Sequence, residues 1–526
     1  MLKDRGVAKV FESIVGPDNF SEDPAIVSSY TFQTTAHMGA DLLKDMYDLV
    51  KMGAVIMPGS TEEVQAIVRV CNRYRINYKA FSTGLGPWGT PMKEGSLQID
   101  LRRMDRIIKL DDKNMYAVVE PYVSNRALMV EAMKKGLVCH VGGAGSQTSA
   151  LAATTALAGN GHSATTTGIG GRNCLGVEWV LPTGDVVRWG LVEEGKTGHP
   201  GPGLWGVARG ERGSVGGLGV FTKCAAKLFP WYGPAQLETT GKYPTPGYRI
   251  PDNFKVHLLA FPSREARAEA TYKLTDAEVA YHVWYHPLFM HVQRWMSESN
   301  DDHYEIWKKL QTAGVVGRSL NEMTVVIGAY SEQELQYKEK VVKDIIEETG
   351  AETLIPDFMT EHDIERFFCA QIAVHKPCTE FRLGGGDMGN GVFQFMHFDN
   401  HVKMWKKMYE LQKQYVDRGV LTDLGGESGW GGPLEQKAVG HTEYPNFTNP
   451  RDPELVRGQS RFIAEGMEFA VRERLLGTGG VADSFAHEHL GDYVVYQKRI
   501  KETLDPNDVA DPYGYFTVAS ERIESS

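Results

Sequence analysis

The fold of this chain is decided by Phe81-Ser82-Thr83-Gly84-Leu85-Gly86-Pro87-Trp88-Gly89-Thr90. This glycine loop lies between two short apolar runs, residues 76–81 and 96–101, and the second run alternates as a half-buried strand does. Because glycine has no side chain, the backbone N–H groups of such a loop can approach an anion closely. The spacing matches neither the phosphate loop of nucleotide hydrolases nor the Rossmann dinucleotide fingerprint. On these residues alone, an ordinary glycine-rich turn is the alternative.

The residues before the loop predict a strand, a helix and a second strand. Residues 54–57 form a short apolar run that ends at a Pro-Gly pair. Ser60 and Glu63 have the spacing of a capping box, which marks a helix N-terminus. Four apolar residues then recur at helical spacing before a strand expected at residues 78–81. The glycine loop therefore leaves the second strand of a βαβ unit, which is where α/β sheets place ligands.

Length, charge and cysteine content limit the class of protein. A chain of 526 residues exceeds one usual hydrophobic core and predicts two or three domains. The net charge of −11 argues against nucleic-acid binding, which needs a basic surface. The six cysteines are scattered without a C-x-x-C pair, which favours reduced thiols in a cytoplasmic protein. No stretch of the sequence is typical of a signal peptide or of a membrane span.

A second region of small residues covers residues 141–171. Such side chains allow close approach of the backbone but form a poor core, so a bulky flat ligand could fill the space they leave. The alternative is a flexible loop. We favour a ligand because a strong hairpin pattern follows directly at residues 176–189.

The second half of the chain has the sequence pattern of another α/β unit. Glycines and prolines between residues 241 and 251 indicate a linker before it. Three strand patterns are each followed by an amphipathic helix pattern. The expected strand–helix pairs are 255–260 with 264–274, 324–329 with 332–349, and 392–398 with 402–418.

Six short segments occur along the chain in a recognisable order and spacing. They are Pro58-Gly59-Ser60, the glycine loop, Tyr116-Ala117-Val118-Val119-Glu120-Pro121, Leu175-Gly176-Val177-Glu178, Gly219-Val220-Phe221-Thr222 and Leu504-Asp505-Pro506-Asn507. Together they resemble the signature runs of the FAD-binding flavoprotein family of vanillyl-alcohol oxidase and 4-cresol dehydrogenase. Each piece alone is weak, but the combination is specific, and the resemblance covers nearly the whole chain.

The resemblance implies an α+β fold, with a two-subdomain PCMH-type FAD-binding domain and an α/β cap domain over the flavin. We expect the FAD-binding domain at residues 1–235, the substrate or cap domain at 236–475, and a C-terminal return to the FAD-binding domain at 476–526. The glycine loop would bind the diphosphate, and the flavin ring would lie between the small-residue region and the cap. The expected cofactor contacts are Ser82, Thr83, Gly84, Leu85, Gly86, Pro87, Trp88, Gly89, Gly143, Thr155, Ala158, Gly159, Gly161, His162, Gly168, Val220 and Thr222.

Several positions depart from the family's phenol-oxidising members. Trp88 stands where they have a tyrosine, and Ser484 and Phe485 stand where they have a Tyr-Arg pair. Ile169 takes the place of their acidic residue beside flavin N5. These losses argue against a para-hydroxybenzyl substrate, since indole cannot ionise as a phenol does. Neither usual histidine anchor for the flavin is present, so we expect noncovalent FAD, with His162 as the exception left open.

Flavin oxidation of an alcohol needs a base for the O–H proton, and five side chains are candidates for the catalytic site. His397 ends an alternating strand, with a structural histidine as the competing interpretation. Glu427 lies among glycines and is either a loop carboxylate or a catalytic group. His487 and His489 flank a glutamate without a third ligand at metal-site spacing, so we expect no metal there. Trp88 would pack on the flavin or line the pocket, with core packing as the alternative.

The leading hypothesis is an FAD-dependent dehydrogenase or oxidase. It would take a hydride from a C–H bond of a small organic substrate, such as an aromatic or alicyclic alcohol, onto flavin N5. The alternatives are an FAD-linked 2-hydroxy-acid dehydrogenase and a flavin-binding electron-transfer subunit without its own substrate. The expected partners are an external electron acceptor (oxygen, a cytochrome or another flavoprotein) and, by family analogy, a second copy of the chain in a homodimer.

Overall fold

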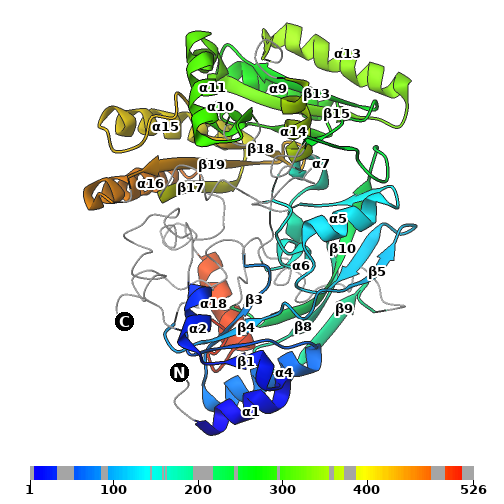
Figure 1. Ribbon diagram of the computed structural model, residues 1–526, viewed down its shortest axis with the longest axis vertical. Helices are drawn as coiled ribbons and strands as arrows, with labels where there is room; N and C mark the ends of the chain where they lie inside the picture. The colour runs from blue at the N-terminus through cyan, green and yellow to red at the C-terminus, as the bar shows by residue number, and fades with distance from the viewer. Residues whose placement is uncertain are drawn as a thin grey trace.

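The computed structural model describes residues 5–31, 52–84, 93–141, 145–156, 159, 161, 163–193, 217–241, 247–292, 296–354, 360–371, 387–449, 451–475 and 492–511. Figure 1 shows two bodies stacked along the longest axis of the molecule. The N-terminal half of the chain builds the lower body, and helix α18 (Asp492–Leu504) returns to it from the C-terminal end. Both bodies combine helices with sheets, so the predicted α+β class is confirmed.

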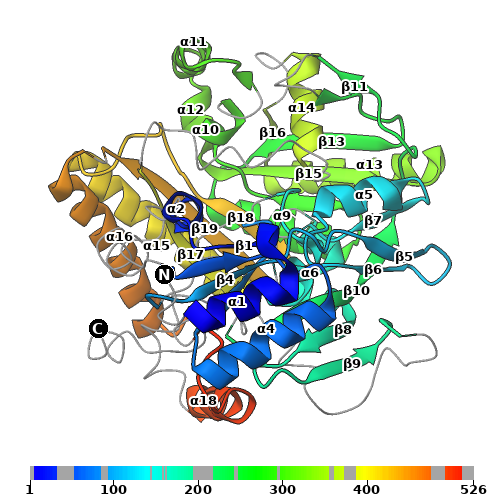
Figure 2. The same cartoon turned by 60° about the horizontal axis from the view of Figure 1, so that its bottom comes forward.

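The first sheet of the lower body has the strand order β1-β2-β4-β3. Strands β2, β4 and β3 are parallel, and β1 is antiparallel to β2. Helices α1 and α4 lie side by side across this sheet in Figure 2, and their apolar faces join its core. The bounds are β1 Phe20–Ser21, β2 Ala54–Ile56, β3 Tyr78–Phe81, β4 Leu97–Asp100, α1 Arg5–Val15 and α4 Thr61–Tyr74.

Local signals in this sheet are confirmed, but the pairing differs from expectation. Ser60 caps α4 by accepting a hydrogen bond from Glu63 N, while the Glu63 carboxylate accepts one from Gly59 N at 2.7 Å. Strand β4 lies between β2 and β3, and all four of its residues are buried. The expectation of a half-buried strand was therefore wrong, because a central parallel strand is covered on both faces.

The second sheet of the lower body has the order β5-β6-β10-β8-β9, and β7 also pairs with β10. The predicted hairpin is confirmed as β8 and β9. Ser124 caps α5 and Ser149 caps α6, in each case through the side-chain oxygen. The bounds are β5 Ile107–Asp111, β6 Tyr116–Val119, β7 Leu137–Cys139, β8 Cys174–Val180, β9 Val186–Gly190, β10 Val220–Pro230, α5 Asn125–Met133, α6 Ala150–Thr154 and α7 Ala164–Thr167.

A buried carboxylate joins the two sheets of the lower body. Glu178 on β8 accepts hydrogen bonds from Thr61 on α4 and from Arg188 on β9, both at 2.5 Å. Lys223 on β10 forms an ion pair with it at 2.9 Å. Burial opposes its charge, but these hydrogen bonds outweigh burial and lower the pKa of Glu178 to about 2. Glu178 thus connects α4, which packs on the first sheet, to strands β9 and β10 of the second sheet.

The residues after α18 run beside the first sheet. Ala510 forms a parallel bridge with Tyr78 on β3, and Val509 O accepts a hydrogen bond from Tyr78 N at 2.9 Å. Lys79 and Asp511, both buried, form an ion pair at 2.6 Å. Residues 509–511 therefore extend the edge at which β3 lies.

The upper body contains two antiparallel sheets, β14-β15-β13-β16 and β17-β19-β18. A bridge between Tyr285 and Gly431 joins them, so we describe them together as the cap sheet. Helices α9, α13, α15 and α16 pack on one face of it. The bounds are β13 Phe254–Ala260, β14 His282–Trp284, β15 Glu322–Gly328, β16 Glu352–Thr353, β17 Asp387–Met396, β18 Trp430–Leu434, β19 Val439–Thr448, α9 Arg264–Asp276, α13 Glu332–Thr349, α15 Phe398–Asp417 and α16 Pro453–Arg472.

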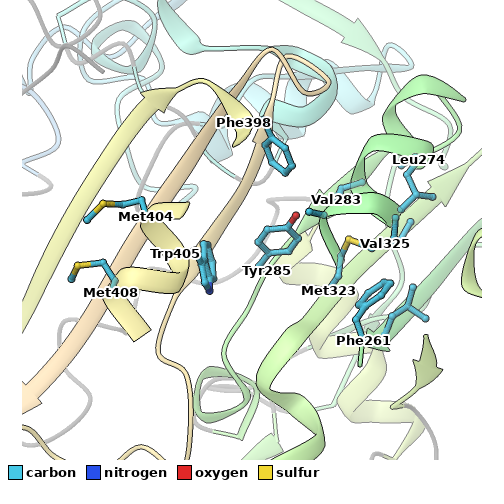
Figure 3. Close-up of a cluster of buried hydrophobic side chains, with 14 of the residues drawn as sticks. Phe261, Leu274, Val283, Tyr285, Met323, Val325, Phe398, Met404, Trp405 and Met408 are labelled. Atoms are coloured by element: carbon cyan, nitrogen blue, oxygen red, sulfur yellow. The ribbon is translucent and has the colours of Figure 1, made fainter. Parts of the chain in front are cut away.

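The largest core of the upper body lies between the cap sheet and these helices. Figure 3 shows Tyr285 from the sheet beside Trp405 from α15, and their ring centroids are 5.2 Å apart. The expected third strand and helix are present, but β17 ends before His397 and α15 begins four positions before the predicted start at 402. The remaining short elements are α2 Pro24–Thr31, β11 Thr239–Thr240, β12 Gly247–Tyr248, α10 Leu288–His291, α11 Asn300–Thr312, α12 Val315–Arg318, α14 Glu361–Gln371 and 3₁₀ turns at Pro17–Asn19, Gly170–Asn173 and Ser319–Asn321.

Candidate functional site

The cap sheet has a second face, opposite the one that α9, α13, α15 and α16 cover, and α10, α11, α12 and α14 pack on the part of it around β13. Side chains alternate along β14, so Val283 and Tyr285 enter the helix-covered core. Trp284 instead joins a separate buried cluster that includes Ala164 and Ile169 of the lower body. The face that carries Trp284 is therefore turned toward the lower body.

Helix α7 of the lower body contacts the cap sheet directly. Thr165 Oγ1 donates a hydrogen bond to Val283 O at 3.1 Å, and it accepts one from Val283 N at 3.3 Å. At the turn after β18, Glu435 N donates to Ala164 O at 2.9 Å. The Glu435 carboxylate accepts from Ile169 N and forms an ion pair with Arg172. These contacts fix the position of the cap sheet over the small-residue region.

Four histidines and two tryptophans meet on this face, and we call them the histidine–tryptophan cluster. The members are His282, Trp284, His286, His291, Trp430 and His441. The two indole rings lie edge to face at 4.9 Å, and His441 lies 6.1 Å from Trp284 and 5.4 Å from Trp430. His286 links the indoles to His291 on α10, with centroid distances of 6.4 Å and 5.7 Å. The result is a buried aromatic surface with several proton-exchanging rings.

Gly432 gives Trp284 the space for this arrangement. It stands opposite His441 in the β18–β19 register. A Cβ atom added at Gly432 would lie 2.9 Å from Trp284 Cε3 and 3.0 Å from Val283 O. Trp284 therefore reaches across β18 toward His441 because position 432 has no side chain.

Two histidine–carboxylate pairs belong to this face. His291 Nε2 lies 2.6 Å from Glu322 Oε2, and the other Glu322 oxygen accepts a hydrogen bond from His286 N at 2.7 Å. His441 Nε2 lies 2.9 Å from Glu443 Oε1 on the same strand. A carboxylate accepts the imidazole N–H in each pair and so fixes the ring tautomer. Either pair is suited to proton transfer.

The small-residue region of the lower body is held by His140. Its Nδ1 lies 2.8 Å from Thr167 Oγ1, and its Nε2 donates to Gly159 O at 2.8 Å. Burial lowers the pKa of His140 to about 4, so the ring is neutral at physiological pH. Gly170 has no room for a side chain, because a Cβ there would lie 2.6 Å from Gly159 O and also meet Ala153 O.

The described start of the glycine loop fits the expected diphosphate site. Ser82, Thr83 and Gly84 follow the last residue of β3, and Gly84 adopts a φ of 69°, which favours glycine. Parallel strands bring such loops to the carboxyl edge of a sheet, where ligands bind. Backbone N–H groups without bulky side chains are the donors that a diphosphate needs. The described residues therefore fit FAD, and these are the groups that would hold its phosphates.

The other predicted cofactor residues lie in different surroundings, and some of them are already hydrogen-bonded within the protein. Thr155 and Thr222 are buried, but their hydroxyls donate within the protein, to Leu151 O at 2.8 Å and to Glu178 Oε1 at 3.0 Å. Val220 packs in the core between the two lower sheets. Gly159, Gly161 and Gly168 stay in the small-residue region beside the cap. The predicted contacts that lie outside the described residues are Leu85, Gly86, Pro87, Trp88, Gly89, Gly143, Ala158 and His162.

Of the predicted catalytic residues, the structure describes His397 and Glu427, and these two lie in different surroundings. His397 is 70% exposed and lies 3.6 Å from Asp399 at the start of α15. Glu427 is buried on the helix-covered face of the cap sheet, away from the histidine–tryptophan cluster. Trp88, His487 and His489 lie outside the described residues.

Glu427 belongs to an ionic cluster inside the cap core. Arg264 binds its carboxylate at 3.0 Å, Arg267 approaches to 4.0 Å, and Tyr444 donates to it at 3.1 Å. Burial raises the pKa of Glu427, and the two arginines oppose that rise. The Arg267 guanidinium also lies 4.1 Å from the centroid of the Tyr285 ring. This surrounding suits a structural carboxylate.

Sequence reasoning missed the histidine–tryptophan cluster. The signal was present as the alternation His282-Val283-Trp284-Tyr285-His286, where every second residue carries an aromatic or imidazole ring. In His441-Thr442-Glu443, an imidazole and a carboxylate alternate in the same way along a strand. Which face of a strand meets the cofactor domain depends on contacts between distant segments, so the pattern alone did not decide it.

Metal sites and membrane spans were also sought within the described ranges. There, no group of three or more His, Cys, Asp or Glu side chains is arranged to hold a metal ion. None of the helices that the structure describes is long and apolar enough to cross a membrane.

Comparison with known proteins adds three findings. Residues 52–190 match the family described as FAD binding domain. A probable mitochondrial D-lactate dehydrogenase from Danio rerio is 26% identical over 227 residues, which cover 43% of this chain and 41% of that protein. The 4-cresol dehydrogenase flavoprotein subunit of Pseudomonas putida is 28% identical over 194 residues, which cover 34% of this chain and 35% of that one. The chain thus spans less than half the length of the curated relatives it matches.

A solved structure extends the likeness over nearly the whole chain. Substrate-bound p-cresol methylhydroxylase superposes with a TM-score of 0.74 and covers 98% of this chain and 96% of its own, at 18% identity. Identity at this level shows a shared fold. Residues 52–190 therefore match an FAD-binding domain, FAD is the cofactor, and the chain has the fold of PCMH-type flavoproteins.

Proposed function

We propose that this protein is an FAD-dependent oxidoreductase that takes a hydride from a C–H bond of a small organic substrate. The observation that carries the proposal is the histidine–tryptophan cluster, which lies on the cap-sheet face turned toward the FAD-binding domain. An aromatic surface with imidazoles is suited to a flat, apolar substrate that exchanges a proton. We infer an aromatic or alicyclic alcohol.

Each part of the chain then has a task. The backbone of Ser82–Gly84 and of the loop that follows would hold the FAD diphosphate, and bound FAD supplies a hydride acceptor. Trp284 and Trp430 would exclude water and hold the substrate ring. The histidine–carboxylate pairs would exchange the substrate proton. Ile169, which stands where the phenol-oxidising relatives have an acidic residue, is buried in the same cluster as the two indoles and supports an apolar surrounding.

The finer expectations from sequence are also part of the proposal. We infer a vanillyl-alcohol-oxidase-like member with noncovalent FAD, a cytoplasmic location, an external electron acceptor and a homodimeric assembly. We further infer domain limits at residues 235 and 475, with His487 and His489 near the flavin. The four cysteines among the described residues that carry free thiols are consistent with a reducing compartment.

A 2-hydroxy-acid dehydrogenase is the second candidate. The observation that favours it is the similarity to the D-lactate dehydrogenase from Danio rerio, over 43% of this chain. This candidate needs a cation for the substrate carboxylate. A third candidate, an electron-transfer subunit without a substrate, is disfavoured by the buried rings on the cap face.

Anaerobic mixing of the purified holoprotein with substrate panels tests the proposal. Bleaching of the flavin absorbance by benzylic or alicyclic alcohols is the expected result. Bleaching only by D-lactate or glycolate would instead establish the second candidate. Bleaching by neither panel, with reduction by an electron-carrier protein alone, would support the third.

A further inference from the structure

Asp100 is a buried carboxylate at the ligand-binding edge of the first sheet. It is the last residue of β4, it is paired with Phe81 in the register of β4 with β3, and it is fully buried. Burial of an ionised carboxylate is costly unless hydrogen bonds and an opposite charge compensate for it. The glycine loop begins directly after Phe81. Asp100 therefore lies one strand away from the first residues that would hold the FAD diphosphate.

Tyr30 and Arg102 compensate for the charge of Asp100. Tyr30, on helix α2, donates its hydroxyl hydrogen to Asp100 Oδ2 at 2.6 Å. Arg102 Nε donates to the same oxygen at 2.7 Å, Arg102 N donates to Asp100 Oδ1 at 2.9 Å, and Arg102 Nη2 donates to the Tyr30 hydroxyl at 2.8 Å. Burial and the hydrogen bond to Asp100 raise the pKa of Tyr30 above its ordinary value, so the phenol keeps its proton. These three side chains form one hydrogen-bonded network.

The Tyr30 ring reaches the glycine loop through Phe81. The two rings lie edge to face, with their centroids 5.3 Å apart. The Phe81 ring in turn occupies the space beside Gly84, because a Cβ atom added at Gly84 would clash with it. Gly84 also has a φ of 69°, a conformation that side chains disfavour. The path of the loop at Gly84 therefore depends on the position of the Phe81 ring, which packs against Tyr30.

We propose that Tyr30, Asp100 and Arg102 position the glycine loop for the FAD diphosphate, with helix α2 as their anchor. Asp100 fixes the phenol, the phenol ring supports Phe81, and the Phe81 ring sets the backbone at Gly84. A loop that is already held in its bound conformation loses less conformational freedom when it binds a ligand. The network therefore increases the affinity for FAD without touching it. This inference rests on FAD as the cofactor and is independent of the substrate.

A dilution series of the holoprotein, followed by the fluorescence of released FAD, measures the dissociation constant of FAD. Asp100→Asn and Tyr30→Leu are each expected to raise it roughly 10-fold, the size of one hydrogen bond to a charged group. Arg102→Gln, at a side chain that is 47% exposed, is expected to raise it less and disturbs the fold least. The matched control is Asp111→Asn, where the carboxylate accepts a hydrogen bond from Asn114 N in an exposed turn, and its dissociation constant is expected to equal that of the wild type.

Two further measurements separate positioning of the loop from support of the fold. Circular dichroism of the same diluted samples is expected to keep the wild-type signal while FAD is released. In a Phe81→Leu background, Tyr30→Leu is expected to weaken FAD binding much less, because the ring that Tyr30 supports is then absent. Unchanged dissociation constants in the three network variants would overturn the inference. So would additive effects of Tyr30→Leu and Phe81→Leu, or FAD release that occurs only together with loss of the circular dichroism signal. The proposed function would stand in each case, since flavin reduction by substrate tests it separately.

Discussion

Tyr285 points toward the helices of the cap, whereas its neighbour Trp284 points toward the FAD-binding domain. On the helix-covered face, the charged groups are matched among themselves, as Glu427 is by Arg264 and Arg267. On the opposite face, the imidazoles of His291 and His441 are paired with the carboxylates of Glu322 and Glu443. The strands thus separate a face that holds the cap together from a face suited to chemistry.

The largest effect is expected from Glu427→Ala on the helix-covered face. The substitution leaves Arg264 and Arg267 with an uncompensated buried charge, which typically costs about 3–5 kcal/mol of folding free energy. Urea unfolding of the holoprotein measures it, and Glu427→Gln shows how much of the loss belongs to the charge. A variant of wild-type stability whose flavin is no longer reduced would instead make Glu427 catalytic.

A somewhat smaller loss of folding free energy is expected when acid protonates Glu178. This residue lies outside the cap, so it shows what a paired buried carboxylate contributes away from both cap faces. Hydrogen bonds lower the pKa of Glu178 to about 2, so its stabilisation is full above the unfolded value, about 4.3. It is lost as pH falls through about 2. One pKa unit corresponds to roughly 1.4 kcal/mol, so Glu178 contributes about 3 kcal/mol. Urea unfolding between pH 5 and pH 2 measures this dependence.

Glu178→Gln should flatten that pH dependence and lower stability at neutral pH. The exposed acid of the Lys406–Glu265 pair provides the control, Glu265→Gln, since surface ion pairs contribute little. Equal pH dependence in both variants would contradict the role given to Glu178.

A moderate effect is expected from Gly432→Ala on the face with the histidine–tryptophan cluster. The added methyl group would clash with the Trp284 ring and displace it, and overpacking of this kind costs about 1–3 kcal/mol. Slower flavin reduction and altered tryptophan fluorescence should accompany the loss. Gly317→Ala is the control, because a Cβ there meets nothing within 4 Å. Equal stability and equal flavin reduction of the two variants would mean that the space left at Gly432 is not needed for the placement of Trp284.

The smallest effect is expected from His397→Gln. The side chain is 70% exposed, and substitutions at such positions usually change stability by less than about 0.5 kcal/mol. Flavin reduction by the variant decides the catalytic role that the sequence predicted for His397. A rate reduced about 100-fold would restore that role and weaken the proposal that proton transfer occurs at the histidine–carboxylate pairs.

Local signals made much of the fold predictable. The Ser60 cap, the hairpin at β8 and β9 and the helix Glu332–Thr349 follow from capping, turn and periodicity patterns within a few residues. The position of β4 between β2 and β3 depends on pairing between distant segments, so its burial on both faces was not predicted.

The site was predictable on the cofactor side and less so on the cap side. The glycine loop leaves a parallel strand, which is a local rule. Glu427 has the local appearance of a flexible glycine-loop residue, but its partner Arg264 lies 163 positions earlier in the chain. The histidines of β14 and β19 face the FAD-binding domain because α7 packs against β14 and β18, which are distant from it in sequence.

A crystal structure of the FAD-loaded protein with a bound alcohol or its carbonyl product tests the central claim most directly. The account predicts that the ligand lies between the flavin ring and the indoles of Trp284 and Trp430, on the face that carries the histidine–tryptophan cluster. A ligand beside Glu427, or a flavin ring remote from the face that carries Trp284, would contradict it.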